Sequence, residues 1–304
     1  MRTIFTTLVF VFFFTPSVKA CDICGCGNNG NYIGILPEFQ KYIIGVRYRH
    51  NALRSHLGAN GQSTYLTNNE KYTSYELWGS IRLSKKMNLL FALPYHYNQQ
   101  FGETVKQSIQ GIGDINLVNY YTLFQSNQLT KQNKVFLQSG RAAMGVKLPT
   151  GKFDIANANS SSQLFTNGTG TLDFIFGAVY EARLQNTGVN ISANYKLNTV
   201  NSSGYQYGNK FQYSAQMYQK LFVRKDFSIA PNIGVQFERN RKDQNLGNEV
   251  DVSGGDLTTL NYGAELKFKK ILVGANLQSP ISQNIANHQI EANDRWMMHL
   301  SYAF

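Results

Sequence analysis

Hydrophobic and polar residues alternate along most of the chain after residue 38, with a period of two. The apolar Val189, Ile191 and Ala193 share one face of their segment, whereas Asn190 and Ser192 lie on the other. Such alternation is typical of β-strands whose two faces meet different surroundings. Most of the runs exceed the ~5–6 residues of an ordinary strand and reach the ~9–11 that cross a bilayer at a tilt. The pattern predicts twelve strands, near 38–52, 71–84, 88–100, 111–125, 134–148, 170–184, 188–199, 208–223, 227–240, 256–268, 271–281 and 290–304.

The predicted connections are of two kinds, short turns and long polar loops, and the two kinds alternate along the chain. Bacterial outer-membrane barrels have an even number of strands, short periplasmic turns and longer external loops. A soluble β-sandwich gives no reason for two classes of connection. The sequence therefore predicts an all-β fold, a transmembrane antiparallel up-and-down β-barrel of about twelve strands over 38–304, with both chain ends in the periplasm. Short turns are expected at 85–87, 126–133, 185–187, 224–226 and 269–270, and long loops at 53–70, 101–110, 149–169, 200–207, 241–255 and 282–289.

Residues 1–20 have the features of a secretory signal peptide. Arg2 precedes an apolar stretch over 8–14 that is too short to span a bilayer. Val18 and Ala20 fit the small-residue rule for cleavage, which makes Cys21 the first residue of the mature protein. The predicted organisation is therefore a signal peptide, a mature N-terminal segment over 21–37, and the barrel in the outer membrane of a Gram-negative cell.

All three cysteines of the chain, Cys21, Cys24 and Cys26, lie together at the predicted mature N-terminus. They cannot cross-link the barrel, and three roles are open: a local disulfide, acylation of Cys21, or a thiolate site for Cu or Zn. In the last case the protein would handle metal at the periplasmic mouth, with His50 or His56 as a further ligand. No other cofactor is predicted.

Composition narrows the class of protein. The chain has 304 residues with 20 Phe, 18 Tyr, 2 Trp and 26 Gly but only 6 Pro, and its mean hydropathy is −0.30. These values exclude a multi-helix membrane protein and a disordered chain. The formal net charge of +11 does not by itself identify a partner, and nothing in the sequence indicates nucleic acid binding.

The last predicted strand ends on Phe304 and carries aromatic residues on one face, namely Trp296, Tyr302 and Phe304. This ending resembles the C-terminal signal that the bacterial barrel-assembly machinery recognises. The expected partners are that machinery, outer-membrane lipids and a small-molecule solute of unknown identity.

The alternation also predicts which charged side chains enter the barrel. Twelve strands enclose an interior wider than that of ~8-stranded barrels and narrower than the pore of ~16–18-stranded porins. A narrow passage for small solutes follows, and the Gly- and Asn-rich segment 21–37 could plug it. Charges of both signs are expected to pair inside or to stay hydrated. The predicted interior residues are Arg47, Arg49, Glu76, Arg82, Asp114, Arg141, Lys147, Asp173, Glu181, Arg183, Glu238, Glu265, Lys267, Arg295 and His299.

Four short motifs stand in order through the middle of the chain. They are GIGD over 111–114, KLPTG over 147–151, GTGTLD over 168–173, and NYKLN over 194–198 with Gly204-Tyr205 after it. The first is not a phosphate loop, because a strand follows it instead of GK[ST] and a helix. Its glycines are expected to let the strand kink at the barrel rim, and Pro149 is expected to end a strand.

In this order the motifs resemble those of the outer-membrane transporter family named for the meta-cleavage pathway of phenol degradation. The resemblance covers about residues 109–225. It implies an outer-membrane β-barrel that transports a poorly defined substrate, and it does not establish phenol as that substrate. The Cys-rich N-terminus followed by Tyr48-Arg49-His50 also looks like a subgroup from Bacteroidetes-type bacteria.

The sequence leaves an outer-membrane lipid hydrolase as a further alternative. His299 and Ser301 lie two residues apart on one face of the last strand, but no nucleophile motif surrounds any serine. That face is also predicted to be the inner one, which an interfacial lipase could not use. No catalytic residue is therefore predicted, and we expect the protein not to be an enzyme.

Overall fold

The computed structural model describes residues 42–58, 61–103, 106–153 and 165–304. The predicted signal peptide, the segment 21–37 and the three cysteines lie outside the described residues. No helical segment in the described ranges has the length and hydrophobicity needed to span a membrane.

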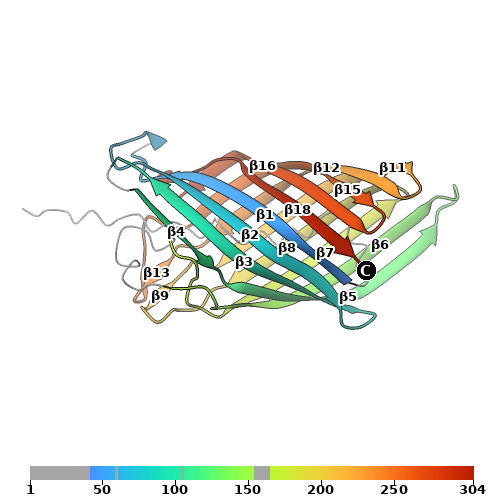
Figure 1. Cartoon of the computed structure of the whole chain (residues 1–304), viewed down its shortest axis with the longest axis horizontal. Helices are drawn as coiled ribbons and strands as arrows, with labels where there is room; N and C mark the ends of the chain where they lie inside the picture. The colour runs from blue at the N-terminus through green and yellow to red at the C-terminus, as the bar shows by residue number, and fades with distance from the viewer. Residues whose placement is uncertain (1–41, 59–60, 104–105, 154–164) are drawn as a thin grey trace, which may run out of the picture.

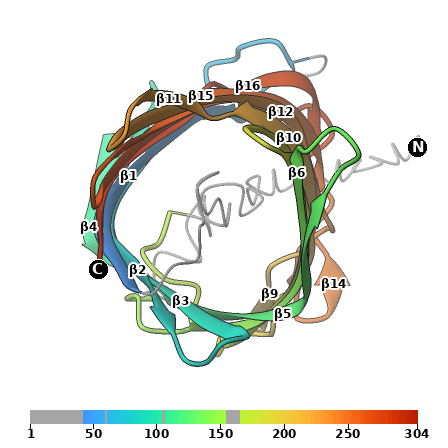
Figure 2. The ribbon, with the colours of Figure 1, turned by 90° about the vertical axis from the view of Figure 1, so that its right-hand side faces the viewer.

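The described residues form antiparallel strands that close into a barrel (Figures 1 and 2). Successive positions in the wall are filled by strands that follow one another in sequence, and the last strand pairs with the first. The strands of the wall are β1 (Tyr42–Ser55), β2 (Asn68–Arg82), β3 (Met87–Phe101), β4 (Lys106–Ile112), β5 (Ile115–Leu129), β6 (Val135–Leu148), β7 (Asp173–Leu184), β8 (Thr187–Leu197), β10 (Lys210–Gln219), β11 (Leu221–Arg224), β12 (Phe227–Asn240), β15 (Gly255–Phe268), β16 (Ile271–Ile285), β17 (Glu291–Ala292) and β18 (Arg295–Ala303).

At three positions in the wall, two consecutive strands lie end to end and pair with the same neighbouring strand. β4 and β5 both pair with β3, β10 and β11 with β12, and β17 and β18 with β1. The described wall is therefore a closed antiparallel barrel of twelve strands, as the sequence predicts.

The two ends of the barrel differ. At one end, called the turn end, the connections are short, at 83–86, 130–134, 185–186, 225–226 and 269–270, and both β1 and β18 have their outer termini there. At the opposite end, called the loop end, most connections are longer, and the short ones are 102–105 and 286–290. A small sheet of β9 (Tyr205–Gln206), β13 (Gln244–Asn245) and β14 (Asn248–Glu249) joins two of these loops.

Two predicted loops are wrong in extent. The sequence predicts a long loop at 101–110, but β4 begins at Lys106, which pairs with Phe101, so only 102–105 lie between the strands. Most of β4 is solvent-exposed on both faces, so its sequence lacks the alternation that marks a wall strand. Likewise β16 continues to Ile285 and takes up half of the loop expected at 282–289.

The barrel is apolar outside and polar inside. On β18, Met298, Leu300 and Tyr302 are exposed, whereas the alternate residues His299 and Ser301 are buried. Large hydrophobic side chains are exposed all around the wall, and the buried set is rich in Asn, Gln, Ser and charged residues. Soluble monomers rarely expose apolar patches larger than a few hundred Å². The outer face is therefore a surface for lipid.

A charge in the middle of this outer face should destabilise the barrel. Ile233 is exposed halfway along β12, so Ile233→Arg would place a guanidinium in the hydrocarbon and cost about 2–4 kcal/mol of unfolding free energy in a bilayer. Leu246→Arg is the matched control, because Leu246 is exposed in the β13–β14 turn beyond the wall. Urea titration in lipid vesicles measures both variants, and equal losses for the two would contradict a lipid-facing wall.

Candidate functional site

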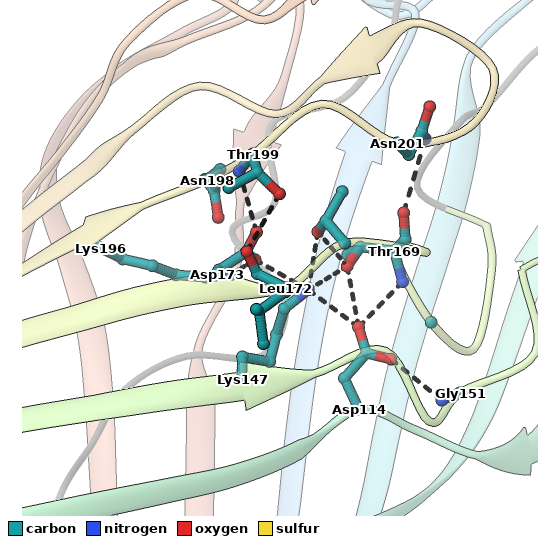
Figure 3. A network of polar contacts seen from close by, with 12 residues as sticks. Asp114, Lys147, Gly151, Thr169, Leu172, Asp173, Lys196, Asn198, Thr199 and Asn201 are labelled. Carbon is teal, nitrogen blue, oxygen red and sulfur yellow. Dashed lines mark hydrogen bonds and ion pairs between the residues drawn. The ribbon is translucent and has the colours of Figure 1, made fainter.

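The four sequence motifs meet at the loop end of one side of the barrel (Figure 3). Asp114 lies in the break between β4 and β5, Lys147 near the end of β6, Asp173 at the start of β7 and Lys196 near the end of β8. The cross-strand pairs Lys147↔Asp173 and Ile175↔Lys196 bring these positions to nearly the same height along the barrel wall. Neighbouring strands run in opposite directions, so residues far apart in the sequence become neighbours at one rim.

These four side chains form a row of alternating charges, called here the rim network. Lys147 Nζ lies 2.9 Å from Asp114 Oδ2 and 2.8 Å from Asp173 Oδ2. Lys196 Nζ lies 3.1 Å from the same Asp173 oxygen. The Lys147 and Asp173 side chains are almost completely buried, at 3% and 0% exposure. Burying an isolated charge is costly, and the alternation of two cations with two anions offsets that cost and leaves the row neutral.

The two carboxylates also hold the loops. Asp114 Oδ1 accepts a hydrogen bond from Gly151 N at 3.0 Å, and Asp114 Oδ2 accepts one from Thr169 N at 2.9 Å. Asp173 Oδ1 accepts one from Thr199 N at 3.1 Å. Hydrogen bonds to charged groups are about twice as strong as neutral ones. The rim network therefore fixes the backbone on both sides of the long connection between β6 and β7.

Three motif glycines are explained by close packing at this rim. A Cβ on Gly151 would lie 2.7 Å from the Gly168 Cα, and a Cβ on Gly168 would lie 2.6 Å from the Gly151 carbonyl carbon. The two loop segments thus touch backbone to backbone. A Cβ on Gly113 would lie 2.1 Å from His96 Nε2 on β3. Larger residues at these positions would push the loops off the carboxylates.

The structure confirms the predicted kink at GIGD and the predicted strand end at Pro149. It also joins these two motifs, which the sequence does not predict. The strand does break between β4 and β5 at the GIGD motif, and β6 ends at Leu148, one residue before Pro149. Thr150 Oγ1 bridges that break, accepting from Ile115 N at 3.0 Å and donating to Gly113 O at 2.9 Å. The sequence prediction placed each motif separately and did not join them.

A second cluster of predicted interior residues lies on β1, β2, β15 and β18. Arg47 Nε donates to Glu76 Oε2 at 2.7 Å, and Arg49 Nε lies 3.4 Å from Glu76 Oε1. The Arg47 guanidinium also lies over the Trp78 ring, 5.2 Å from its centroid. Trp78 in turn meets His299 edge-on at 5.6 Å. Cation–π and aromatic contacts thus join the arginine pair to the last strand.

His299 continues this cluster to a second carboxylate and to Ser301. Its Nε2 lies 2.9 Å from Glu265 Oε2, and its Nδ1 lies 3.3 Å from Ser301 Oγ. Both His299 and Ser301 are buried on the inner face of β18, away from the lipid-facing wall. A lipid in the bilayer therefore does not reach this pair, which is the geometry expected from the sequence.

The remaining predicted interior residues pair in smaller groups or lie near the turn end. Glu238 binds Lys210 at 2.8 Å and Arg295 at 3.1 Å, and it is 2% exposed. Glu181 accepts a hydrogen bond from Tyr218 at 2.6 Å and lies 3.9 Å from Arg141. Three more are less enclosed: Arg183 and Lys267 are half-buried, and Arg82 is exposed at the end of β2.

Sequence reasoning missed Lys196 and Lys210 as members of these clusters. Lys196 has no role in the sequence prediction, although in the structure it joins the alternating row of charges in the rim network. The available signal was the alternation of Asp and Lys at the loop ends of consecutive strands. Lys210 follows the same rule, since it lies opposite Asn240 in the β10–β12 pair and bonds Glu238, two residues further along β12.

The candidate metal ligands are only partly described. His50 Nδ1 contacts Thr73 Oγ1 at 3.2 Å, and His56 lies in the loop after β1, where burial lowers its pKa. In the ranges that the structure covers, His, Cys, Asp and Glu form no group of three or more suited to a metal ion. The cysteine cluster is outside those ranges, so the Cu or Zn site stays a prediction.

Comparison with known proteins identifies the fold. No protein-family model and no curated protein sequence matches the chain. An outer membrane channel from Pseudomonas putida F1 is similar in structure, with a TM-score of 0.60 and 19% identity over 91% of this chain and 99% of that one. The β domain of the Bordetella autotransporter BrkA has a TM-score of 0.51 and 8% identity over 86% of this chain and 99% of that one. The chain thus has the fold of bacterial outer-membrane β-barrels.

Removing one charge from the rim network should destabilise the barrel. Asp114→Asn keeps the shape of the side chain but leaves the network with an excess positive charge and weaker acceptors for Gly151 N and Thr169 N. We expect a loss of unfolding free energy on the order of 2 kcal/mol in vesicles.

Asp256→Asn is the matched control at the same end of the barrel. Its partner Arg239 is 62% exposed, so this pair should contribute less than about 1 kcal/mol. Denaturant titration in vesicles measures the loss of unfolding free energy in both variants. A loss for Asp114→Asn no larger than that for Asp256→Asn would show that the rim network does not stabilise the barrel.

Proposed function

We propose that the protein is an outer-membrane channel for small solutes. The observation that carries this proposal is the closed wall of twelve strands with an apolar outer face and a charged, polar inner face. Charges of both signs along the interior have to be desolvated and paired, and together with the buried Asn, Gln and Ser they give the barrel a polar lining. Channel walls use such side chains to replace the hydration of passing solutes.

The likeness to the Pseudomonas putida channel supports the proposal, because that protein is described as an outer membrane channel. Membership of the phenol-degradation transporter family remains a proposal that rests on the four motifs. The contacts among the four motifs in the rim network support it, since the motifs then serve one structural role together.

The two kinds of connection support an orientation of the barrel in the membrane. In bacterial outer-membrane barrels the short turns face the periplasm and the longer loops face outward. The turn end carries Lys85, Lys86, Arg224 and Lys225, and such residues are worth about 1 kcal/mol each near anionic headgroups. We therefore place the turn end, with the outer termini of β1 and β18, on the periplasmic side.

Three expectations from the sequence stay as proposals beside the channel. They are a Cu or Zn site at Cys21, Cys24 and Cys26, recognition of Phe304 by the barrel-assembly machinery, and the absence of enzymatic activity. Titration of the mature protein with copper or zinc, against a variant with all three cysteines changed to serine, tests the first. A phospholipase assay comparing the parent with Ser301→Ala tests the last.

Planar-bilayer recording tests the proposed channel directly. The mature chain should give discrete conductance steps smaller than those of porins with ~16–18 strands. A variant lacking 21–37 should conduct more if that segment plugs the barrel. Heat-denatured protein is the control for leaks caused by detergent. If neither the mature chain nor the deletion variant conducts, the protein is not a channel.

A further inference from the structure

A row of amide side chains lies on the inner face of β10, β12, β15 and β16. In the cross-strand register Gln216 lies opposite Gly234, and Gly234 lies opposite Asn261. Asn261 in turn lies opposite Gln278. Asn232 and Gln236 lie two residues to either side of Gly234, on the same face of β12. We call five of these residues the amide belt: Gln216, Asn232, Gln236, Asn261 and Gln278.

Two amides of the belt are deeply buried and have atoms without a hydrogen-bond partner. Asn232 is 6% exposed, and neither its Nδ2 nor its Oδ1 bonds any described residue. Asn261 is 1% exposed, and its Oδ1 accepts a hydrogen bond from Thr259 Oγ1 at 2.9 Å. The Nδ2 of Asn261 has no partner in the part of the chain that the structure describes. Buried polar atoms in folded proteins are nearly always paired, so these three atoms are positions at which a ligand can bond.

The two asparagines share a small square of the wall with two glycines. Asn232 lies opposite Gly263. Gly234 lies opposite Asn261, so asparagine and glycine alternate across β12 and β15. A Cβ on Gly234 would lie 2.5 Å from Gln216 Cγ, so the Gln216 side chain extends over that glycine. Diagonal neighbours in such a strand pair are about 7–8 Å apart, so the unpaired atoms of Asn232 and Asn261 can meet one small solute together.

On β12 and β15 the belt lies between two charged clusters and is itself uncharged. Glu238, with Lys210 and Arg295, bounds it toward the loop end. Glu265, with His299, bounds it toward the turn end. A charged group held between them would lose its hydration without a counter-ion on these strands, whereas a neutral solute does not meet this cost. The inward residues of the two strands between the glutamates are Ala230, Asn232, Gly234, Gln236, Thr259, Asn261 and Gly263.

The opposite side of the inner wall carries an apolar cluster. In the order of strands around the closed wall, β3 and β5 lie half-way round from β12 and β15. The interior thus has amides on one side and apolar and aromatic side chains on the other. Binding sites for small molecules commonly combine apolar walls with a few polar groups that fix the orientation of the ligand. The largest members of the cluster, on β2, β3, β5 and β7, are Trp78, Leu90, Val118, Tyr120 and Ile175.

We infer that the amide belt binds a neutral, hydroxyl-rich solute of the size of a small sugar. An amide offers an acceptor oxygen and two donor hydrogens, and each hydroxyl is both donor and acceptor. Two adjacent hydroxyls of a sugar can therefore pair with Oδ1 and Nδ2 of Asn232 at once, and a third can accept from Asn261 Nδ2. The C–H faces of the same sugar ring suit the apolar side of the interior. The inference names the class of solute for the proposed function, and it rests on that proposal for the passage of the solute but not for its binding.

Saturation-transfer NMR in phosphatidylcholine vesicles measures binding without requiring conduction. The probes are glucose and sucrose, with benzoate as a charged probe, and they are titrated against the mature chain and against the variant lacking 21–37. The test variants are Asn232→Leu and Asn261→Leu, each of which replaces an amide by an apolar side chain of similar size. Asn88→Leu is the matched control, because Asn88 is an inward asparagine of β3 with 5% exposure and lies outside the belt.

The parent should bind at least one of the sugars, and more tightly than benzoate. Each test variant should weaken sugar binding by about tenfold, since it loses one or two hydrogen bonds, whereas the control should bind as the parent does. Sugar binding that is present only in the variant lacking 21–37 also supports the site and shows that this segment competes for it. A shift in gel migration on heating shows that each variant has folded, and either test variant alone suffices.

Three outcomes would overturn the inference. They are the absence of sugar binding both in the mature chain and in the variant lacking 21–37, equal weakening of sugar binding in Asn88→Leu, and tighter binding of benzoate than of either sugar.

A liposome-swelling assay in glucose keeps this inference distinct from the proposed function. The variant lacking 21–37 should admit glucose, and adding Asn232→Leu should slow glucose entry severalfold while the conductance for potassium chloride stays unchanged. Sugar binding by a protein that neither conducts nor admits glucose would leave the binding site standing and remove the channel. Conductance by a protein that binds no sugar would leave the channel standing and remove the inferred site.

Discussion

The pairing of β1 with β18 is the interaction on which the rest of the structure depends. Eight residue pairs join the two strands, from Ile43↔Ala303 to His50↔Trp296. The hydrocarbon of a bilayer offers no hydrogen-bond partner, so each unpaired backbone group in it costs several kcal/mol. A sheet with these outward apolar side chains is stable in lipid only if its edges meet. Once they meet, every strand has one face toward lipid and one toward the interior.

Closure also explains where the charges are and how they are paired. Side chains that alternate with the lipid-facing ones point inward, so Arg47, Glu76 and Glu238 are buried however costly their desolvation. The barrel offsets part of this cost by pairing opposite charges. The rim network has two cations and two anions, and Glu76 and Glu238 each have two cations beside them.

The alternation in the sequence was enough to predict the twelve wall strands, and for β12 it predicted the observed bounds, 227–240. It failed at β4, where both faces meet solvent and no alternation exists. The inward or outward direction of a side chain depends only on this local period, so Asp114, Lys147 and Asp173 could be placed inside. Their contacts with one another depend on the stagger between strands, which no local pattern contains. The contact of Gly151 with Gly168 could not be predicted either, because it forms between two loop segments far apart in the sequence.

Hydrogen–deuterium exchange in lipid vesicles tests closure of the barrel most directly. If β1 and β18 are paired, the backbone amides over 43–50 and 296–303 should exchange as slowly as those in the middle of β2. If the barrel is open at this seam, half of the amides on each strand lack a partner there, and they should exchange as fast as the loop at 61–67. Slow exchange along both strands is the predicted result, and fast exchange confined to these two strands would contradict the closed barrel.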